Sequence, residues 1–190
     1  MERIKNFLKI SADLKMQVAE TLSDKILEAA NRISTSLGNG GKLLLMGNGG
    51  SAADAQHIAA ELIGRFKKER RALPALALTV DSSCLTALGN DYGFDTVFSR
   101  QIEALVRKGD VVIGISTSGN SENVVRGLKL ANEMGAETIG LLGNTGGRIK
   151  DVAGLAIVVP SNDTARIQEA HITIGHIICE IVEQGITHAG

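Results

Sequence analysis

The chain contains no tryptophan, and aromatic residues make up only 3% of it. Proteins that bind single-stranded nucleic acid stack the bases on aromatic side chains, which this sequence scarcely has. The formal net charge is −1, so no general positive field attracts a phosphate backbone. The composition therefore argues against a nucleic-acid-binding protein.

Long apolar runs are also missing, since none reaches the ~18 residues that a membrane-spanning helix needs. Residues 1–5 begin a charged amphipathic helix and lack the apolar core of a signal peptide. The two cysteines, Cys84 and Cys179, lie in apolar surroundings without CxxC spacing, which favours buried free thiols. We therefore expect a cytoplasmic protein.

The sequence contains only two prolines and has no Ser/Pro-rich linker, internal repeat or low-complexity tract. Its 190 residues are therefore expected to form a single domain over residues 1–190. Residues 1–37 carry apolar side chains at helical spacing and form an N-terminal helical segment. Residues 38–190 are predicted to form an α/β core that ends in a long C-terminal helix.

Short apolar runs alternate with helical patterns through this core. The predicted strands are 42–46, 74–80, 110–115, 137–142 and 155–159, and the predicted helices are 52–66, 94–107, 122–134 and 164–185. Such alternation is typical of a parallel sheet with helices on both faces. We expect a doubly wound five-stranded α/β sheet in the flavodoxin-like order 2-1-3-4-5. The loops after its first and third strands would then open a ligand crevice.

The loop after the first predicted strand is rich in glycine and leads into a helix, with the sequence Gly47-Asn48-Gly49-Gly50-Ser51. Glycine lets backbone N–H groups approach an anion closely. The start of the helix adds unpaired donors and the positive end of the helix dipole. This loop is therefore a candidate anion site.

The loop after the third predicted strand carries four hydroxyl side chains and a glycine before the next helix, in the sequence Ser116-Thr117-Ser118-Gly119-Asn120-Ser121. A single serine here would be read as a helix N-cap. Four hydroxyls beside backbone N–H groups favour a phosphate instead. The loop is neither a Walker loop nor a GxGxxG fingerprint.

Two predicted helices carry polar side chains that suit a metal ion. His57 and Glu61 are one helical turn apart and share a face. Gln168 and His176 are two turns apart on the last helix. A lone histidine is usually structural, but these four together could supply nitrogen and oxygen donors. His171 lies off this stripe and is expected to be structural or interfacial.

These motifs resemble those of the phosphoheptose isomerase family, within the sugar isomerase (SIS) domain superfamily. The matching segments are 47–51, 57–65, 89–94, 115–121 and 165–169, together with His176. They span nearly the whole chain in the expected order. Many sugar-phosphate binders share the phosphate loop, whereas its combination with the four metal candidates is much more specific.

The resemblance implies a role for each matching residue. Substrate and phosphate binding would fall to Asn48, Gly49, Gly50, Ser51, Arg65, Asn90, Asp91, Ser116, Thr117, Ser118, Ser121 and Gln168. A Zn²⁺ ion in each subunit would be held by His57, Glu61, Gln168 and His176. Ala165 stands where some relatives carry an aspartate, which leaves no acid to act at that position.

The implied activity is aldose–ketose isomerisation of D-sedoheptulose 7-phosphate to D-glycero-D-manno-heptose 7-phosphate through an enediol, the first step of bacterial ADP/GDP-heptose synthesis. Glu61 would be the carbon base and His176 would move protons between the oxygens, so these two are the catalytic candidates. A zinc-bound carboxylate is a weaker base. Either the metal shifts during turnover or the substrate displaces a ligand.

The resemblance also implies a homotetramer with active sites between subunits, in which segment 1–37 would serve oligomerisation. Two other readings remain: a sugar-phosphate sensor, and a non-catalytic SIS module of the replication-initiator-associating type. The latter lacks the glutamate and the histidine at the positions of Glu61 and His176. Their presence here favours the enzyme.

Overall fold

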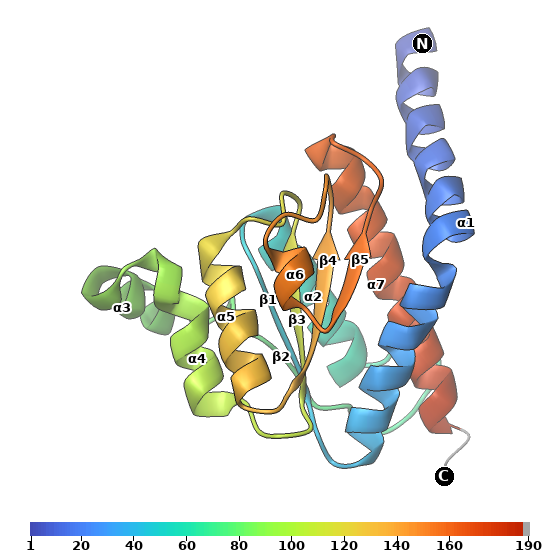
Figure 1. Ribbon diagram of the computed structural model, residues 1–190. Helices are drawn as coiled ribbons and strands as arrows, with labels where there is room; N and C mark the ends of the chain where they lie inside the picture. Colours follow the sequence, from blue (N-terminus) through green and yellow to red (C-terminus); the bar gives the residue numbers. More distant parts are fainter. Residues whose placement is uncertain (188–190) are drawn as a thin grey trace.

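The computed structural model describes residues 1–187, which form a three-layer α/β domain (Figure 1). The central sheet has the strand order β2-β1-β3-β4-β5, and each of its pairings is parallel. Its strands are β1 (Leu43–Gly47), β2 (Ala75–Ala77), β3 (Val111–Ser116), β4 (Glu137–Leu142) and β5 (Leu155–Val158). The predicted doubly wound architecture is confirmed.

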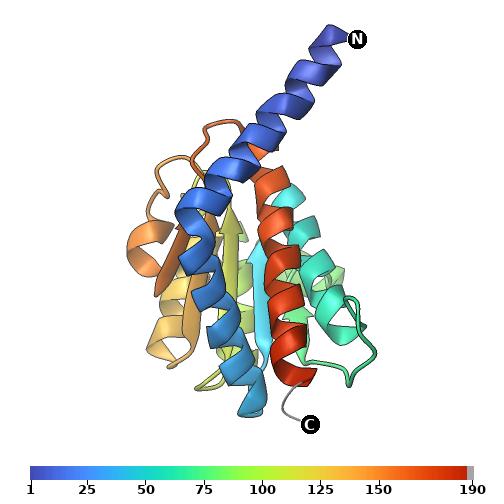
Figure 2. The ribbon, with the colours of Figure 1, turned by 90° about the vertical axis from the view of Figure 1, so that its right-hand side faces the viewer.

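Helices cover both faces of the sheet. One face carries α1 (Glu2–Gly38), α2 (Gly50–Ile63) and α7 (Thr164–Thr187), seen together in Figure 2. The other face carries α3 (Ser82–Tyr92), the 3₁₀ turn η1 (Phe94–Thr96), α4 (Val97–Leu105), α5 (Glu122–Glu133) and α6 (Ile149–Val152). The helices after β1 and β3 therefore leave towards opposite faces.

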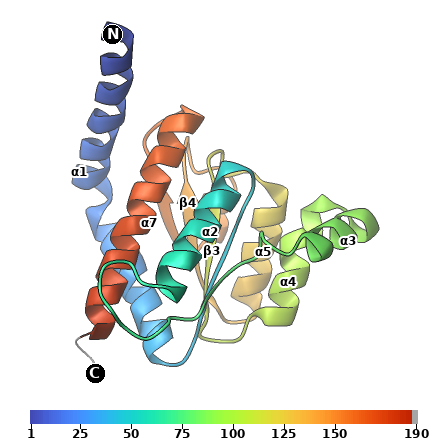
Figure 3. The same ribbon diagram turned by 180° about the vertical axis from the view of Figure 1, so that it is seen from behind.

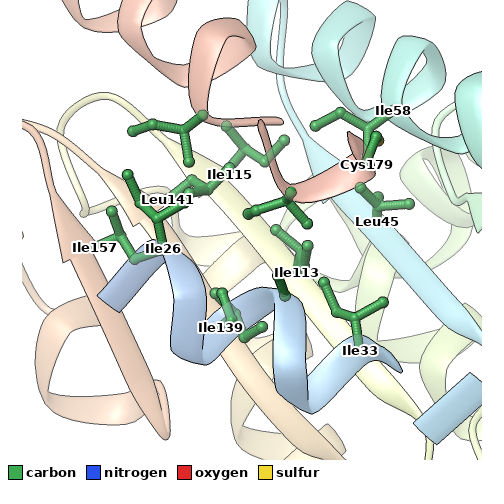
Figure 4. Packing of buried hydrophobic residues seen from close by; sticks show 14 of the residues in the cluster. Ile26, Ile33, Leu45, Ile58, Ile113, Ile115, Ile139, Leu141, Ile157 and Cys179 are labelled. Atoms are coloured by element: carbon green, nitrogen blue, oxygen red, sulfur yellow. The ribbon is translucent and has the colours of Figure 1, made fainter. Parts of the chain in front are cut away.

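Because helices cover both faces of the sheet, its strands carry apolar side chains on both faces. Side chains alternate along a strand, so Leu43 and Leu45 enter the cluster beneath α1, α2 and α7. Leu44 and Met46 enter the cluster beneath α4 and α5. Figure 4 shows the first cluster, in which Ile33 of α1 and other labelled residues pack against the sheet.

Some sequence predictions need correction. Neither α3 nor α6 is predicted, because α3 has no buried residue to create an apolar stripe and α6 has only four residues. The predicted helix 94–107 divides into η1 and α4, and the predicted strand 74–80 shortens to β2. Both cysteines are free thiols, but Cys84 is only half-buried because it lies on the exposed helix α3, whereas Cys179 is buried.

The two long helices, α1 and α7, pack along each other. The first part of α1 extends beyond the body of the molecule (Figures 1 and 2). Its apolar side chains Ile4, Phe7 and Leu8 are exposed. Within residues 1–187, no helix combines the length and the apolar character that crossing a membrane requires.

His171 of α7 is fully buried, as expected for a structural histidine. Its Nε2 atom lies 3.0 Å from the Leu142 carbonyl oxygen, a hydrogen bond that ties α7 to β4. Burial lowers the pKa of the imidazole to about 4, although the bond to Leu142 opposes this shift. His171 is therefore neutral in the folded protein near pH 7.

This burial predicts a specific pH dependence of stability. An unfolded histidine titrates near pH 6.5, so between about pH 6.5 and 4 only the unfolded chain takes up the proton. The free energy of unfolding should fall by up to about 1.4 kcal/mol per pH unit in that range. Urea unfolding at pH 7 and pH 5 measures this loss. His171→Gln, which keeps a donor for Leu142, should show a shallower dependence, and equal slopes would contradict the prediction.

Candidate functional site

The loops after β1 and β3 lie side by side at the carboxyl edge of the sheet. Gly47 at the end of β1 pairs with Ile115 near the end of β3. Beyond them, Asn48 and Asn123 exchange two side-chain hydrogen bonds of 2.9 Å each. The two candidate phosphate loops thus lie next to each other, as the strand order predicts.

The first loop turns sharply into α2. Gly49 is the N-cap of α2 and has φ +56°, a conformation that side chains with a Cβ rarely adopt. A Cβ on Gly47 would lie 2.7 Å from the carbonyl oxygen of Ser51. These glycines allow the first turn of α2, with its positive dipole end, to begin directly after β1 at this edge of the sheet.

The second loop is closed by its own hydroxyl groups. The Oγ atoms of Ser116 and Ser121 lie 3.0 Å apart, and the Gly119 N–H donates to Ser116 Oγ at 3.1 Å. Gly119 has φ +69° and lies against the Gly146 carbonyl, where a Cβ would collide. A hydroxyl has one donor and two acceptor sites, so these serines can hold the loop and still contact a phosphate.

Three of the four predicted metal ligands converge where α2 passes α7. His57 Nε2 lies 3.0 Å from Glu61 Oε1 and 3.2 Å from His176 Nε2. All three donor atoms lie within 4.8 Å of one another. Metal–ligand bonds of 2.0–2.2 Å place the donors of a tetrahedral site roughly 3.3 Å apart. The two nitrogens and the oxygen therefore fit a divalent metal ion.

Gln168, the fourth predicted ligand, lies elsewhere in this chain. Its amide packs against Gly50, so closely that a Cβ on that glycine would collide with it. It precedes His176 by two turns of α7, which is about 12 Å along the helix. Within one chain Gln168 thus borders the glycine-rich loop, and the His57–Glu61–His176 cluster lies further along α2, with His57 exposed and the other two half-buried.

Three further predicted residues, Arg65, Asn90 and Asp91, have exposed side chains. Arg65 follows α2, is exposed, and lies 3.5 Å from Glu69. Asn90 donates to Asp91 at 2.9 Å, and both are exposed at the end of α3. Figures 1 and 3 place α3 at the far edge of the molecule from α7. The structure does not bring Asn90 and Asp91 to the cluster of the same chain.

The sequence reasoning missed three residues beside the site. The Oδ2 atom of Asp54 is buried without a hydrogen-bond partner among the described residues. Burial raises the pKa of this carboxyl, and nearby His57 partly offsets the rise. Its position one turn before His57 could have revealed it. The other two residues are Asn123, which fixes Asn48, and Phe66, whose ring centroid lies 5.6 Å from that of His176. No sequence pattern marks either of them.

Comparison with known proteins gives consistent matches. The model of the SIS domain family matches residues 6–143. Phosphoheptose isomerase of Aquifex aeolicus is 59% identical over 184 residues, 97% of this chain and 96% of that protein. Phosphoheptose isomerase of Geotalea daltonii is 56% identical, with the same coverage.

Two solved structures have the same fold over nearly their whole length. Phosphoheptose isomerase of Neisseria gonorrhoeae has a TM-score of 0.91 and 46% identity, covering 96% of this chain and 98% of that one. Phosphoheptose isomerase of Francisella tularensis has a TM-score of 0.93 and 38% identity, covering 96% and 97%. At these identities the similarity indicates the same protein family and not only the same fold.

The converging donors predict binding of a divalent ion. Titration with Co²⁺, followed by its visible absorption, should detect a site that His57→Gln and His176→Gln each weaken at least tenfold, since each loses an imidazole donor. His171→Gln is the matched control, because it removes a histidine of α7 outside the cluster. Equal affinities in all four proteins would rule out the cluster as a metal site.

Proposed function

Because the chain belongs to the SIS domain family and, within it, to the phosphoheptose isomerases, we propose that it interconverts D-sedoheptulose 7-phosphate and D-glycero-D-manno-heptose 7-phosphate. The observation that carries this proposal is the meeting of His57, Glu61 and His176 beside two phosphate-type loops. The arrangement unites an anion site with groups that can move protons.

The distance between the glycine-rich loop and the His57–Glu61–His176 cluster suits a long sugar phosphate. Gly50 and His57 are seven residues apart on α2, which is about 10 Å along the helix. A seven-carbon chain can span this distance with its phosphate at the loops and its first two carbons at the cluster. Ser51, the hydroxyls of the second loop and the amide of Gln168 would then bind the phosphate and the sugar.

Isomerisation moves a proton between the first two carbons and another between their oxygens. Glu61 is suited to the carbon transfer, because a carboxylate can remove the proton and return it to the adjacent carbon on the same face. One of its oxygens faces His57 at 3.0 Å, which leaves the second for the substrate. His176 would then exchange protons with the oxygens. A metal ion held by these residues would polarise the carbonyl and stabilise the enediolate charge.

The identity of the metal and its full ligand set are finer parts of the proposal. Zinc is supported by the two imidazoles and the carboxylate, which are donors that Zn²⁺ accepts. Gln168 remains a predicted ligand, and its contact with Gly50 supports the substrate role. Gln168→Ala in a zinc titration separates these two roles.

We also propose a homotetramer with shared active sites. Its support is the row of exposed apolar residues on α1, together with the distance of Asn90 and Asp91 from the cluster of their own chain. A second copy could bring these residues to the substrate. A cytoplasmic location remains a prediction.

A variant of Glu61 tests its place in the mechanism. Glu61→Gln should lower kcat by about 10² or more, because an amide cannot accept the carbon proton. Zinc content must be measured in parallel, since Glu61 is also a candidate ligand. Glu69→Gln is a suitable control, because Glu69 is exposed and pairs only weakly with Arg65 at 3.5 Å. Near-normal turnover of zinc-loaded Glu61→Gln would remove Glu61 from the mechanism.

The activity itself is tested by proton NMR of sedoheptulose 7-phosphate with the zinc-loaded protein in D₂O. The expected result is aldoheptose with deuterium at C2, because an enediol intermediate exchanges its proton with solvent through Glu61. Aldose without deuterium would retain the activity but indicate a shielded transfer or a hydride shift. An unchanged ketose would contradict the proposed function and favour the binding module.

A further inference from the structure

The end of α2 is held by an arginine from the loop that follows it. Glu61 lies in the last turn of α2, where backbone carbonyls lack partners within the helix. Arg70 Nη2 donates to the Glu61 carbonyl at 2.9 Å, and Nη1 donates to the carbonyls of Leu62 and Gly64 at 2.9 and 3.1 Å. A positive charge at this end also opposes the negative end of the helix dipole.

Arg70 is in turn held by a residue of α7. The Nε atom of Arg70 lies 3.2 Å from Glu183 Oε1, and the two side chains are only 3% and 2% exposed. The same carboxylate accepts backbone N–H groups of Phe66, Lys67 and Lys68 at 3.0, 2.8 and 2.9 Å. Glu183 thus fixes both the arginine and the first part of the loop.

Charge balance requires both members of this pair. Burial alone would raise the pKa of Glu183, but the three backbone N–H groups and Arg70 lower it further than burial raises it. The carboxylate is therefore ionised. Removing one partner of a buried pair leaves the other charge uncompensated, so neither residue can be lost without a rearrangement of the loop.

The other face of this loop touches the cluster. Phe66 follows α2 closely, and its ring centroid lies 5.6 Å from that of His176. Glu183 follows His176 by seven residues on α7, so both lie on the same face of that helix two turns apart. The contacts of Arg70 and Glu183 therefore connect the backbone of Glu61 to the ring and the helix of His176.

We propose that Arg70 and Glu183 are positioning residues that hold Glu61 and His176 at the spacing which metal binding and proton transfer require. This inference rests on the proposed function, but its metal-binding part can be tested without substrate. Groups that orient metal ligands typically contribute about 10- to 100-fold to metal affinity or activity. A merely structural pair would affect the unfolding temperature and nothing else.

The matched control is Asp110, whose contacts are with residues outside α2 and α7. Asp110 is also buried, at 2% exposed, and accepts backbone N–H groups of Lys42 and Arg107 at 3.0 and 2.7 Å. It pairs with the Lys42 side chain as Glu183 pairs with Arg70. Asp110→Asn therefore removes the same kind of buried charge without removing a contact of α2 or α7.

The experiment compares wild type, Glu183→Gln, Arg70→Lys and Asp110→Asn. Zn²⁺ affinity is measured by competition with a chromophoric chelator, and kcat, KM and Tm are measured on the zinc-loaded proteins. All three variants should lower Tm. Only Glu183→Gln and Arg70→Lys should weaken Zn²⁺ binding and reduce kcat by about tenfold or more, with little change in KM. Arg70→Lys keeps the positive charge but loses the planar guanidinium group, which donates to several carbonyls at once.

Folded Glu183→Gln and Arg70→Lys with wild-type Zn²⁺ affinity and kcat would overturn the proposal. An inactive wild type would instead refute the proposed function, and the comparison of Zn²⁺ affinities would still decide the role of the pair. If neither variant folds, amide hydrogen exchange of the wild type decides. The amides of Phe66, Lys67 and Lys68 should exchange as slowly as those within α2, and fast exchange would contradict a rigid clamp.

Discussion

The close packing of α2 against α7 is the constraint on which the site depends. Gly175 contributes to it, because a Cβ there would lie 2.7 Å from the Cδ1 atom of Ile58 on α2. Where the two helices pack together, His57 and Glu61 on one meet His176 on the other. The sheet positions the phosphate-type loops, whereas this contact between helices positions the candidate metal ligands.

Much of this arrangement could be predicted because it follows local rules. The strands are continuous apolar runs, and their alternation with helices predicts a parallel sheet. The expected order 2-1-3-4-5, which the structure confirms, places the two loops together. The His57–Glu61 pair follows from the helical repeat alone. The exposed helix α3 escaped detection because no apolar stripe marks a helix that buries nothing.

The rest depends on contacts between segments distant in the sequence. Nothing in the spacing of Gln168 and His176 shows that one borders the glycine-rich loop and the other the cluster, since both share a face of α7. The pairing of Arg70 with Glu183 joins residues more than a hundred positions apart. Such contacts arise only once the helices pack, so no local pattern encodes them.

The convergence of donors from two helices also couples ion supply to the integrity of the fold. A ligand that binds only the folded chain adds RT ln(1 + [L]/Kd) to the free energy of unfolding. An ion held by His57 and His176 would act as a cross-link between helices that lie far apart in the sequence. A shortage of the ion would then lower the stability of the contact between α2 and α7 as well as the activity.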